Sequence, residues 1–138
     1  MTLGTERDYS GRSLFEKLGV ASQAHVALVG RHDPTFVTAL NARLAKAASQ
    51  ALRTRYDLIF VRVDAPRDLA RLTPAAAHLK PSGALWVFHP KGRGASPTDA
   101  QVRCAGIAAA LVDNKISAYS DSHTATRFVI PLARRSRV

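Results

Sequence analysis

Residues 57–63 read Asp-Leu-Ile-Phe-Val-Arg-Val, and this run decides the fold class. It is short, apolar and rich in β-branched residues, which is typical of a buried strand rather than a helix. Two similar runs lie on either side of it: His-Val-Ala-Leu-Val-Gly at 25–30 and Ala-Leu-Trp-Val-Phe at 84–88. Strands that are apolar on both faces occur mainly in parallel sheets covered by helices. The three runs therefore predict three buried strands of such a sheet.

Helical segments separate these strands. Asp-Pro at 33–34 has the residue types of a helix start, and apolar residues at helical spacing extend that helix to about Leu52. A second helical segment follows Asp64 and contains Pro74, so we expect a kink or two shorter pieces. A third begins at Thr98, which has the capping-box spacing. Alternating strands and helices predict parallel βαβ units with helices on both faces of the sheet.

The last two expected strands, 115–119 and 127–132, follow each other without a helix, so they should be antiparallel and lie at or near one edge. The expected fold class is therefore α/β, a three-layer Rossmann-like sheet that is mostly parallel with a closing antiparallel strand pair. We expect one domain over residues 1–138, with an ordered core at about 9–132, a flexible N-terminus and a basic C-terminal tail. The strand at 26–29 should lie near an exposed edge, which would allow a homodimer.

Composition excludes several classes of protein. The longest apolar stretches are well short of the ~20 residues that a membrane span needs, and no apolar signal region follows Met1. The single cysteine, Cys104, excludes a disulfide framework and a multi-cysteine zinc site, and we expect it to be a small core residue. His25, His78 and His123 lack metal-ligand spacing, so no metal is expected. These features favour a cytoplasmic protein without a membrane partner.

The formal net charge of +10 suggests an anionic partner, either nucleic acid or a phosphate compound. The basic residues are dispersed along the chain, and only the C-terminal run at 134–137 is dense. Aromatic residues make up 7% of the chain and fall mostly in the expected strands, so they would not form a surface for stacking bases. Binding of nucleic acid therefore remains an alternative that no motif supports.

Residues 56–61 and the segment Leu-Lys-Pro-Ser-Gly at 79–83 resemble the fourth and fifth strands of the S-adenosylmethionine-dependent methyltransferases, where the second segment reads Leu-Lys-Pro-Gly-Gly. The resemblance covers about residues 56–132 and implies a truncated methyltransferase-like sheet. In that superfamily, a glycine-rich turn follows the first strand, and an acidic residue after the second strand binds the ribose. Here Gly30 is followed by Arg-His-Asp-Pro, and no second strand is visible. We therefore expect no cofactor, with S-adenosylmethionine as a disfavoured alternative.

A second resemblance covers nearly the whole chain. An ordered set of short motifs resembles a small bacterial family of unknown function; the set includes Tyr9-Ser10-Gly11, Glu16-Lys17-Leu18-Gly19, Pro90-Lys91, Pro97-Thr98-Asp99 and Arg127-Phe128-Val129. This resemblance supports the same fold and implies no catalytic residues.

The candidate site follows from the expected sheet, because ligands bind beyond the carboxyl ends of parallel strands. The residues expected there are Arg31, His32, Asp64, His89, Lys91, Arg93, Ser96 and Thr98. A base such as His32, oriented by Asp64, is chemically reasonable, but Asp33 and Asp64 also lie where helix caps would. The group from Lys91 to Thr98 precedes a helix, whose free amides attract anions.

Three functions remain open from the sequence. The first is a non-catalytic Rossmann-like module that binds an anionic small molecule or a protein partner through the loops at the strand ends. The second is a divergent S-adenosylmethionine-dependent methyltransferase. The third is a basic protein that binds nucleic acid. Catalysis is not assigned to any residue.

Overall fold

The sheet has the expected mixed architecture. The computed structural model describes residues 12–135, and they form five strands in the order β1-β2-β3-β5-β4. The strands are β1 (Val26–Val29), β2 (Tyr56–Arg62), β3 (Leu79–Pro90), β4 (Val112–Ala118) and β5 (His123–Val129). The β1–β2 and β2–β3 pairs are parallel, whereas β5 is antiparallel to both β3 and β4. The prediction of a mostly parallel sheet with a closing antiparallel pair is confirmed.

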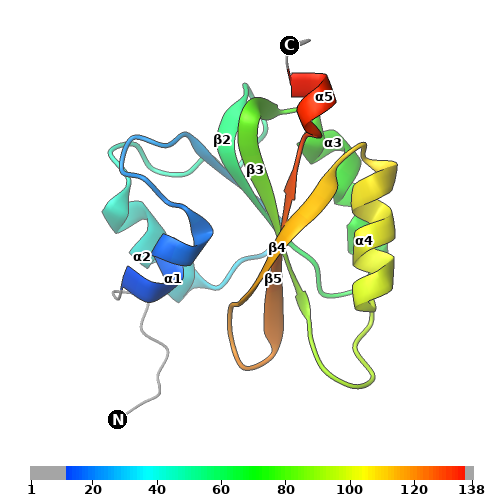
Figure 1. The fold of residues 1–138 in the computed structure, drawn as a ribbon. Helices are drawn as coiled ribbons and strands as arrows, with labels where there is room; N and C mark the ends of the chain where they lie inside the picture. The colour runs from blue at the N-terminus through cyan, green and yellow to red at the C-terminus, as the bar shows by residue number, and fades with distance from the viewer. Residues whose placement is uncertain (1–11, 136–138) are drawn as a thin grey trace.

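Helices cover both faces of this sheet and complete the three layers (Figure 1). On one face lie α1 (Arg12–Leu18) and α2 (Pro34–Arg43). On the other lie the 3-10 helix η1 (Pro66–Arg71), the short α3 (Leu72–Ala76) and α4 (Asp99–Ala108). The expected interruption near Pro74 is thus a change from 3-10 to α-helix at Leu72.

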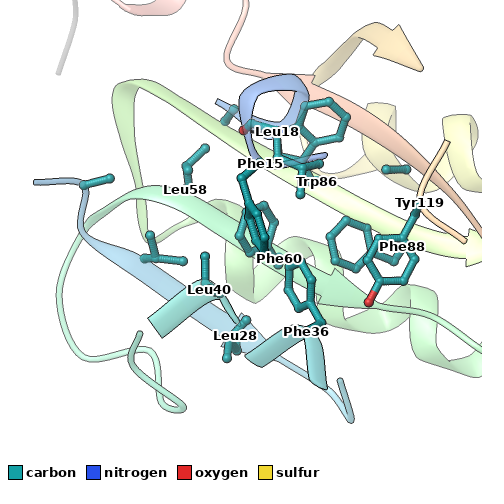
Figure 2. Packing of buried hydrophobic residues seen from close by; sticks show 14 of the residues in the cluster. Phe15, Leu18, Leu28, Phe36, Leu40, Leu58, Phe60, Trp86, Phe88 and Tyr119 are labelled. Carbon is teal, nitrogen blue, oxygen red and sulfur yellow. Dashed lines mark hydrogen bonds between the residues drawn. The ribbon is translucent and has the colours of Figure 1, made fainter. Parts of the chain in front are cut away.

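Aromatic rings fill the core beneath α1 and α2 (Figure 2). The Phe36 ring lies 5.7 Å from the Phe60 ring and 5.5 Å from the Phe88 ring, in edge-to-face arrangements that aromatic pairs prefer. Trp86 is fully buried, and its indole Nε1 donates a hydrogen bond of 3.1 Å to the carbonyl oxygen of Leu18. That bond attaches α1 to the centre of the sheet.

The opposite face is packed by the alternate residues of the same strands. Ile59 and Val61 of β2 point toward this layer, where Leu72 and Val102 of the covering helices are also buried. α4 approaches closely because Gly106 has no side chain. A Cβ atom built at that glycine would lie 2.1 Å from Cε1 of the buried Phe128. Glycine is therefore required there by packing.

The helix after β1 is shorter than predicted. It ends at Arg43 instead of about Leu52, and residues 44–52 then return along the outer edge of β1. Ser49 forms a parallel bridge with Ala27: the amide of Leu28 donates to the Ser49 carbonyl and the Ser49 amide donates to the Val26 carbonyl, both at 2.8 Å. The edge of β1, expected to be exposed, is thus partly covered. Ser49 thus adds a one-residue bridge on the outer side of β1, where the sequence indicated no strand.

Asn41 explains why the helical pattern stops. Its carbonyl accepts the amide of Leu44, and its side-chain Oδ1 accepts the amide of Ala48 at 2.9 Å. These bonds satisfy backbone donors that a continued helix would have satisfied internally. Leu44 and Ala48 still pack against the core, so their apolar spacing arises from an irregular segment.

Cys104 is exposed, which corrects the expectation that it belongs to the core. It lies on the outer side of α4 next to Arg103, also exposed. The alanine-rich sequence around Cys104 does not indicate burial, because small residues occur on exposed helix faces as well as on buried ones.

The ordered structure continues beyond residue 132 in the short helix α5 (Leu132–Arg135). Arg135 donates from Nε to the Ile130 carbonyl at 2.7 Å, and the Arg134 guanidinium bonds to the Ala110 carbonyl. The first part of the basic tail is thus folded, while the expected flexible N-terminus, the Tyr9 motif and residues 136–138 lie outside the described residues. No helix among the described residues is long and apolar enough to cross a membrane.

Candidate functional site

The carboxyl end of β1 is the point where the connections of the sheet diverge. From β1 the chain passes through α2 to Ser49, which lies on the outer side of β1. It then crosses back to β2, which lies on the inner side. Ligands of open α/β sheets bind at such a switch point, outside the carboxyl ends of the strands. Because Ser49 pairs with the outer side of β1 and β2 pairs with its inner side, the switch point lies directly after Val29.

A pocket of about 660 Å³ opens at this position, within the range of small-molecule sites. It is lined by the end of β1, the first turns of α2 and the returning segment: Leu28, Val29, Gly30, Arg31, His32, Pro34, Val37, Thr38, Gln50, Ala51 and Leu52. Gly30 has a positive φ of 92°, and a Cβ atom there would lie 3.0 Å from both the Arg62 carbonyl oxygen and Arg71 Nη1. A side chain at residue 30 would thus disturb the packing of the end of β1 against Arg62 and Arg71.

His32 is held by the sheet instead of by Asp64. Its Nε2 lies 2.8 Å from the Phe60 carbonyl oxygen and 3.1 Å from that of Val29. Both partners can only accept, so Nε2 carries the hydrogen and Nδ1 has a free lone pair, which is buried without a partner. Burial lowers the pKa of His32 below the ordinary histidine value, so the ring is neutral near pH 7.

Asp64 orients a different histidine. Its Oδ1 lies 2.7 Å from Nε2 of His123, and Ser122 Oγ lies 2.7 Å from Nδ1 of the same ring. Arg62 Nε donates to both oxygens of Asp64 at 3.1 and 3.2 Å. Burial alone would raise the pKa of Asp64, but the hydrogen bonds from His123 and Arg62 outweigh it and lower the pKa below the usual range. The pairing of His32 with Asp64, considered from the sequence as one of two alternatives, is therefore not what the structure shows.

His123 reaches this edge because of the direction of β4. β4 pairs antiparallel with β5, which pairs antiparallel with β3, so β4 runs parallel to the central strands. The turn from β4 to β5 consequently lies at the same end of the sheet as the loop after β3, at the lower end of Figure 1. The antiparallel pair was predicted from the sequence, but the position of His123 at this edge was not.

Asp33 begins α2, yet its side chain makes no capping bond. Instead its Oδ2 accepts hydrogen bonds from the Tyr119 hydroxyl at 3.2 Å and from Arg62 Nη1 at 3.5 Å. Asp64 does not cap η1 either, since Asp68 accepts the Ala65 amide at 3.1 Å. Asp33 thus occupies the predicted N-cap position of α2 without a side-chain capping bond, whereas the N-cap of η1 is Ala65 and the prediction for Asp64 is wrong. The two carboxylates share Arg62, and together they connect the β4–β5 turn to the start of α2.

The remaining candidates lie after β3. His89 is 2% exposed; its Nε2 is 2.8 Å from Thr126 Oγ1, its Nδ1 has no hydrogen-bond partner, and burial lowers its pKa. The predicted capping box is confirmed, because Thr98 Oγ1 accepts the Gln101 amide and Gln101 Oε1 accepts the Thr98 amide. Lys91, Arg93 and Ser96 are exposed. Anion binding by this group stays a prediction.

The structure therefore brings only Arg31 and His32 of the predicted residues into the pocket. Thr38, Gln50 and Leu52 were missed, because the sequence analysis placed all three in one continuous helix. The sequence signal that could have found them is Asn41, a residue type that often satisfies backbone donors just outside helices.

Comparison with known proteins identifies the fold. No protein-family model and no curated protein matches the chain. Among solved structures, the SAH-bound form of CalO1, a methyltransferase in calicheamicin biosynthesis, has a TM-score of 0.64 at 14% identity over 90% of this chain. Magnesium protoporphyrin IX methyltransferase from Synechocystis PCC 6803 with bound SAH has a TM-score of 0.64 at 10% identity over 86% of this chain. The CcbJ methyltransferase from Streptomyces caelestis has a TM-score of 0.59 at 10% identity over 92%.

The chain spans 53% of the CalO1 chain, 80% of the protoporphyrin methyltransferase and 91% of CcbJ. At these identities the likeness shows the fold alone. This chain has a methyltransferase-like α/β fold. The strand order agrees with the truncated sheet expected from residues 56–132.

Proposed function

We propose that the chain is a ligand-binding module built on the methyltransferase-like fold, and that it holds a small molecule in the pocket at the carboxyl end of β1. The observation that carries the proposal is the coincidence of a pocket of about 660 Å³ with the switch point of the sheet. The pocket combines apolar walls from Leu28, Val37 and Leu52 with a few polar groups. That combination is typical of sites for small molecules.

The groups in this pocket suit binding better than chemistry. Its polar side chains include the exposed Arg31 and Gln50 and the neutral His32, whose ring is fixed by two backbone carbonyls. A catalytic nucleophile needs an adjacent base to activate it. The oriented pair in this part of the molecule, Asp64 with His123, is not among the residues that line the pocket. We therefore assign the pocket a binding role without turnover.

A methyltransferase that uses S-adenosylmethionine is the second candidate, and it is favoured by solved neighbours that carry SAH. The pocket volume is sufficient for such a ligand, and Gln50 follows Gly30 by twenty positions, the spacing at which dinucleotide-binding folds place a ribose-binding residue. However, the described lining contains no carboxylate, and its charged side chain is a cation. The residues present do not fit a cationic methyl donor, and no reaction step follows from them.

Two variants on the same helix test the pocket. Thr38 is exposed and lines the pocket, whereas Thr35 is exposed on α2 outside it. Isothermal titration with adenosine, SAH and S-adenosylmethionine should show saturable binding of at least one ligand to the unaltered chain. Thr38→Trp should abolish that binding by filling the pocket, and Thr35→Trp should preserve it. Equal binding by both variants, or no saturable binding up to about 1 mM ligand, would contradict the proposal.

A further inference from the structure

We infer that the ligand of this pocket is a nucleoside phosphate, whose phosphate is bound by Arg31 and whose base lies against the apolar walls. The inference rests on the proposed function and names the class of ligand. The arginines near the carboxyl edge differ in whether they have an acidic partner. Arg62 bonds to Asp33 and Asp64, and Arg71 lies 3.4 Å from Asp68. Arg31 has no hydrogen-bond or ion-pair partner among residues 12–135.

The charge around Arg31 is not balanced within the pocket. Among the described lining residues there is no aspartate or glutamate. The neighbouring acid in sequence, Asp33, is already bonded by Tyr119 and Arg62. Arg31 is therefore the charged residue of a lining in which His32 is neutral and the remaining walls are uncharged. Because Arg31 is exposed, solvent and salt screen part of its attraction for an anion, so the affinity depends also on direct hydrogen bonds and on the adjoining apolar walls.

A phosphate suits this arrangement. The planar guanidinium donates two parallel hydrogen bonds to phosphate oxygens, a geometry that a single ammonium group does not provide. A nucleoside monophosphate carries a charge of about −1.5 to −2 at pH 7. SAH is neutral overall and S-adenosylmethionine carries an additional positive sulfonium. The charge of the pocket therefore favours a nucleoside monophosphate over SAH, and SAH over S-adenosylmethionine, even though the solved neighbours carry SAH.

The apolar part of the pocket accounts for the rest of the ligand. Leu28 contributes from β1, Val37 from α2 and Leu52 from the returning segment, so the walls come from three sides. Gln50 carries both a donor and an acceptor and is exposed at the edge of the same cavity. An amide of this kind can bond to sugar hydroxyls without adding charge. A base, a sugar and a phosphate thus each find a matching surface.

Adenosine and adenosine 5′-monophosphate test the inference as a pair, since they differ only in the phosphate. Isothermal titration at about 0.15 M salt should show that the monophosphate binds at least about tenfold more tightly than adenosine. Arg31→Ala should remove most of this difference and leave the affinity for adenosine unchanged, whereas Arg31→Lys should retain part of it. Arg67→Ala is the matched control, because Arg67 is also exposed but lies outside the pocket and its removal lowers the net charge equally.

The outcomes separate the two proposals. If adenosine binds as tightly as the monophosphate and Thr38→Trp abolishes both, the pocket is a binding site and the phosphate inference is overturned. If Arg67→Ala weakens binding of the monophosphate as much as Arg31→Ala does, the attraction comes from the net charge of the chain and the inference is also overturned. If neither ligand binds the unaltered chain, the nucleoside phosphate inference fails; if SAH and S-adenosylmethionine are not bound either, the proposed function fails as well.

Discussion

Replacing Gly106 by alanine should destabilise the chain, although the same change on an exposed helix surface is favourable by about 1 kcal/mol. The new Cβ atom would lie 2.1 Å from Cε1 and 2.6 Å from Cδ1 of Phe128. Carbon atoms in contact prefer about 3.5–4.0 Å, so helix and ring must separate by roughly 1.5 Å. Phe128 is fully buried and α4 is held by its contacts with the sheet, so neither moves freely.

Overpacking of this kind costs about 1–3 kcal/mol, and the size of the overlap places Gly106→Ala at the upper end. Subtracting the gain in helix propensity leaves a net loss of about 2 kcal/mol. Urea unfolding followed by far-ultraviolet circular dichroism should show the midpoint about 1 M lower. Cys104→Ala compared with Cys104→Gly supplies the control for propensity, because Cys104 is exposed on the same helix.

A second variant tests whether Phe128 causes the loss of stability. In the presence of Phe128→Leu, which shortens the opposing side chain, Gly106→Ala should cost much less than it does alone. The packing argument fails if Gly106→Ala equals or exceeds the unaltered chain in stability. It also fails if the cost is the same in both backgrounds, since the loss would then not come from Phe128.

Three further predictions concern other parts of the chain. Trp86→Phe should lower the free energy of unfolding by about 1–3 kcal/mol, because it removes ring volume and leaves the Leu18 carbonyl without its donor, as thermal unfolding can check. The pKa of Asp64 is lowered in the fold, so its stabilising effect is complete above about pH 4, the unfolded value, and is lost as pH falls below it. Asp64→Asn should flatten the stability curve in that window, and an unchanged slope would exclude the bond to His123 as its cause. Cys104 should react with a thiol reagent in the native state; reaction only after unfolding would contradict its exposure.

The sequence predicted the central sheet well because its signal is local. β2 and the apolar part of β3 are continuous runs of residues that are buried on both faces, and no other element accommodates such runs. The end of α2 was mispredicted because Leu44 and Ala48 continue the helical spacing after the helix has stopped. Two features end the helix. Asn41 accepts the Leu44 and Ala48 amides, which is a local signal, and Ser49 pairs with β1, which is a tertiary contact that no local pattern encodes.

The candidate site was predictable only in part for the same reason. Arg31 and His32 follow a strand directly, so their position at the carboxyl edge comes with the strand. The pairing of Asp64 with His123 joins residues 59 positions apart and depends on the direction of β4, which alternation of strands and helices does not set. Long-range polar pairs of this kind can be predicted only when the order and direction of the strands are known.

The outer wall of the pocket pairs with the sheet edge through one isolated bridge at Ser49. The backbone bonds that join Ser49 to β1 run to Leu28 and Val26, and no neighbouring ladder pair supports them. Segments held by few hydrogen bonds open locally at a free-energy cost well below that of global unfolding. We therefore expect the bridge at Ser49 to open more readily than the β1–β2 ladder. Entry and departure of a bound molecule would then be controlled by this local opening, on a timescale separate from that of unfolding.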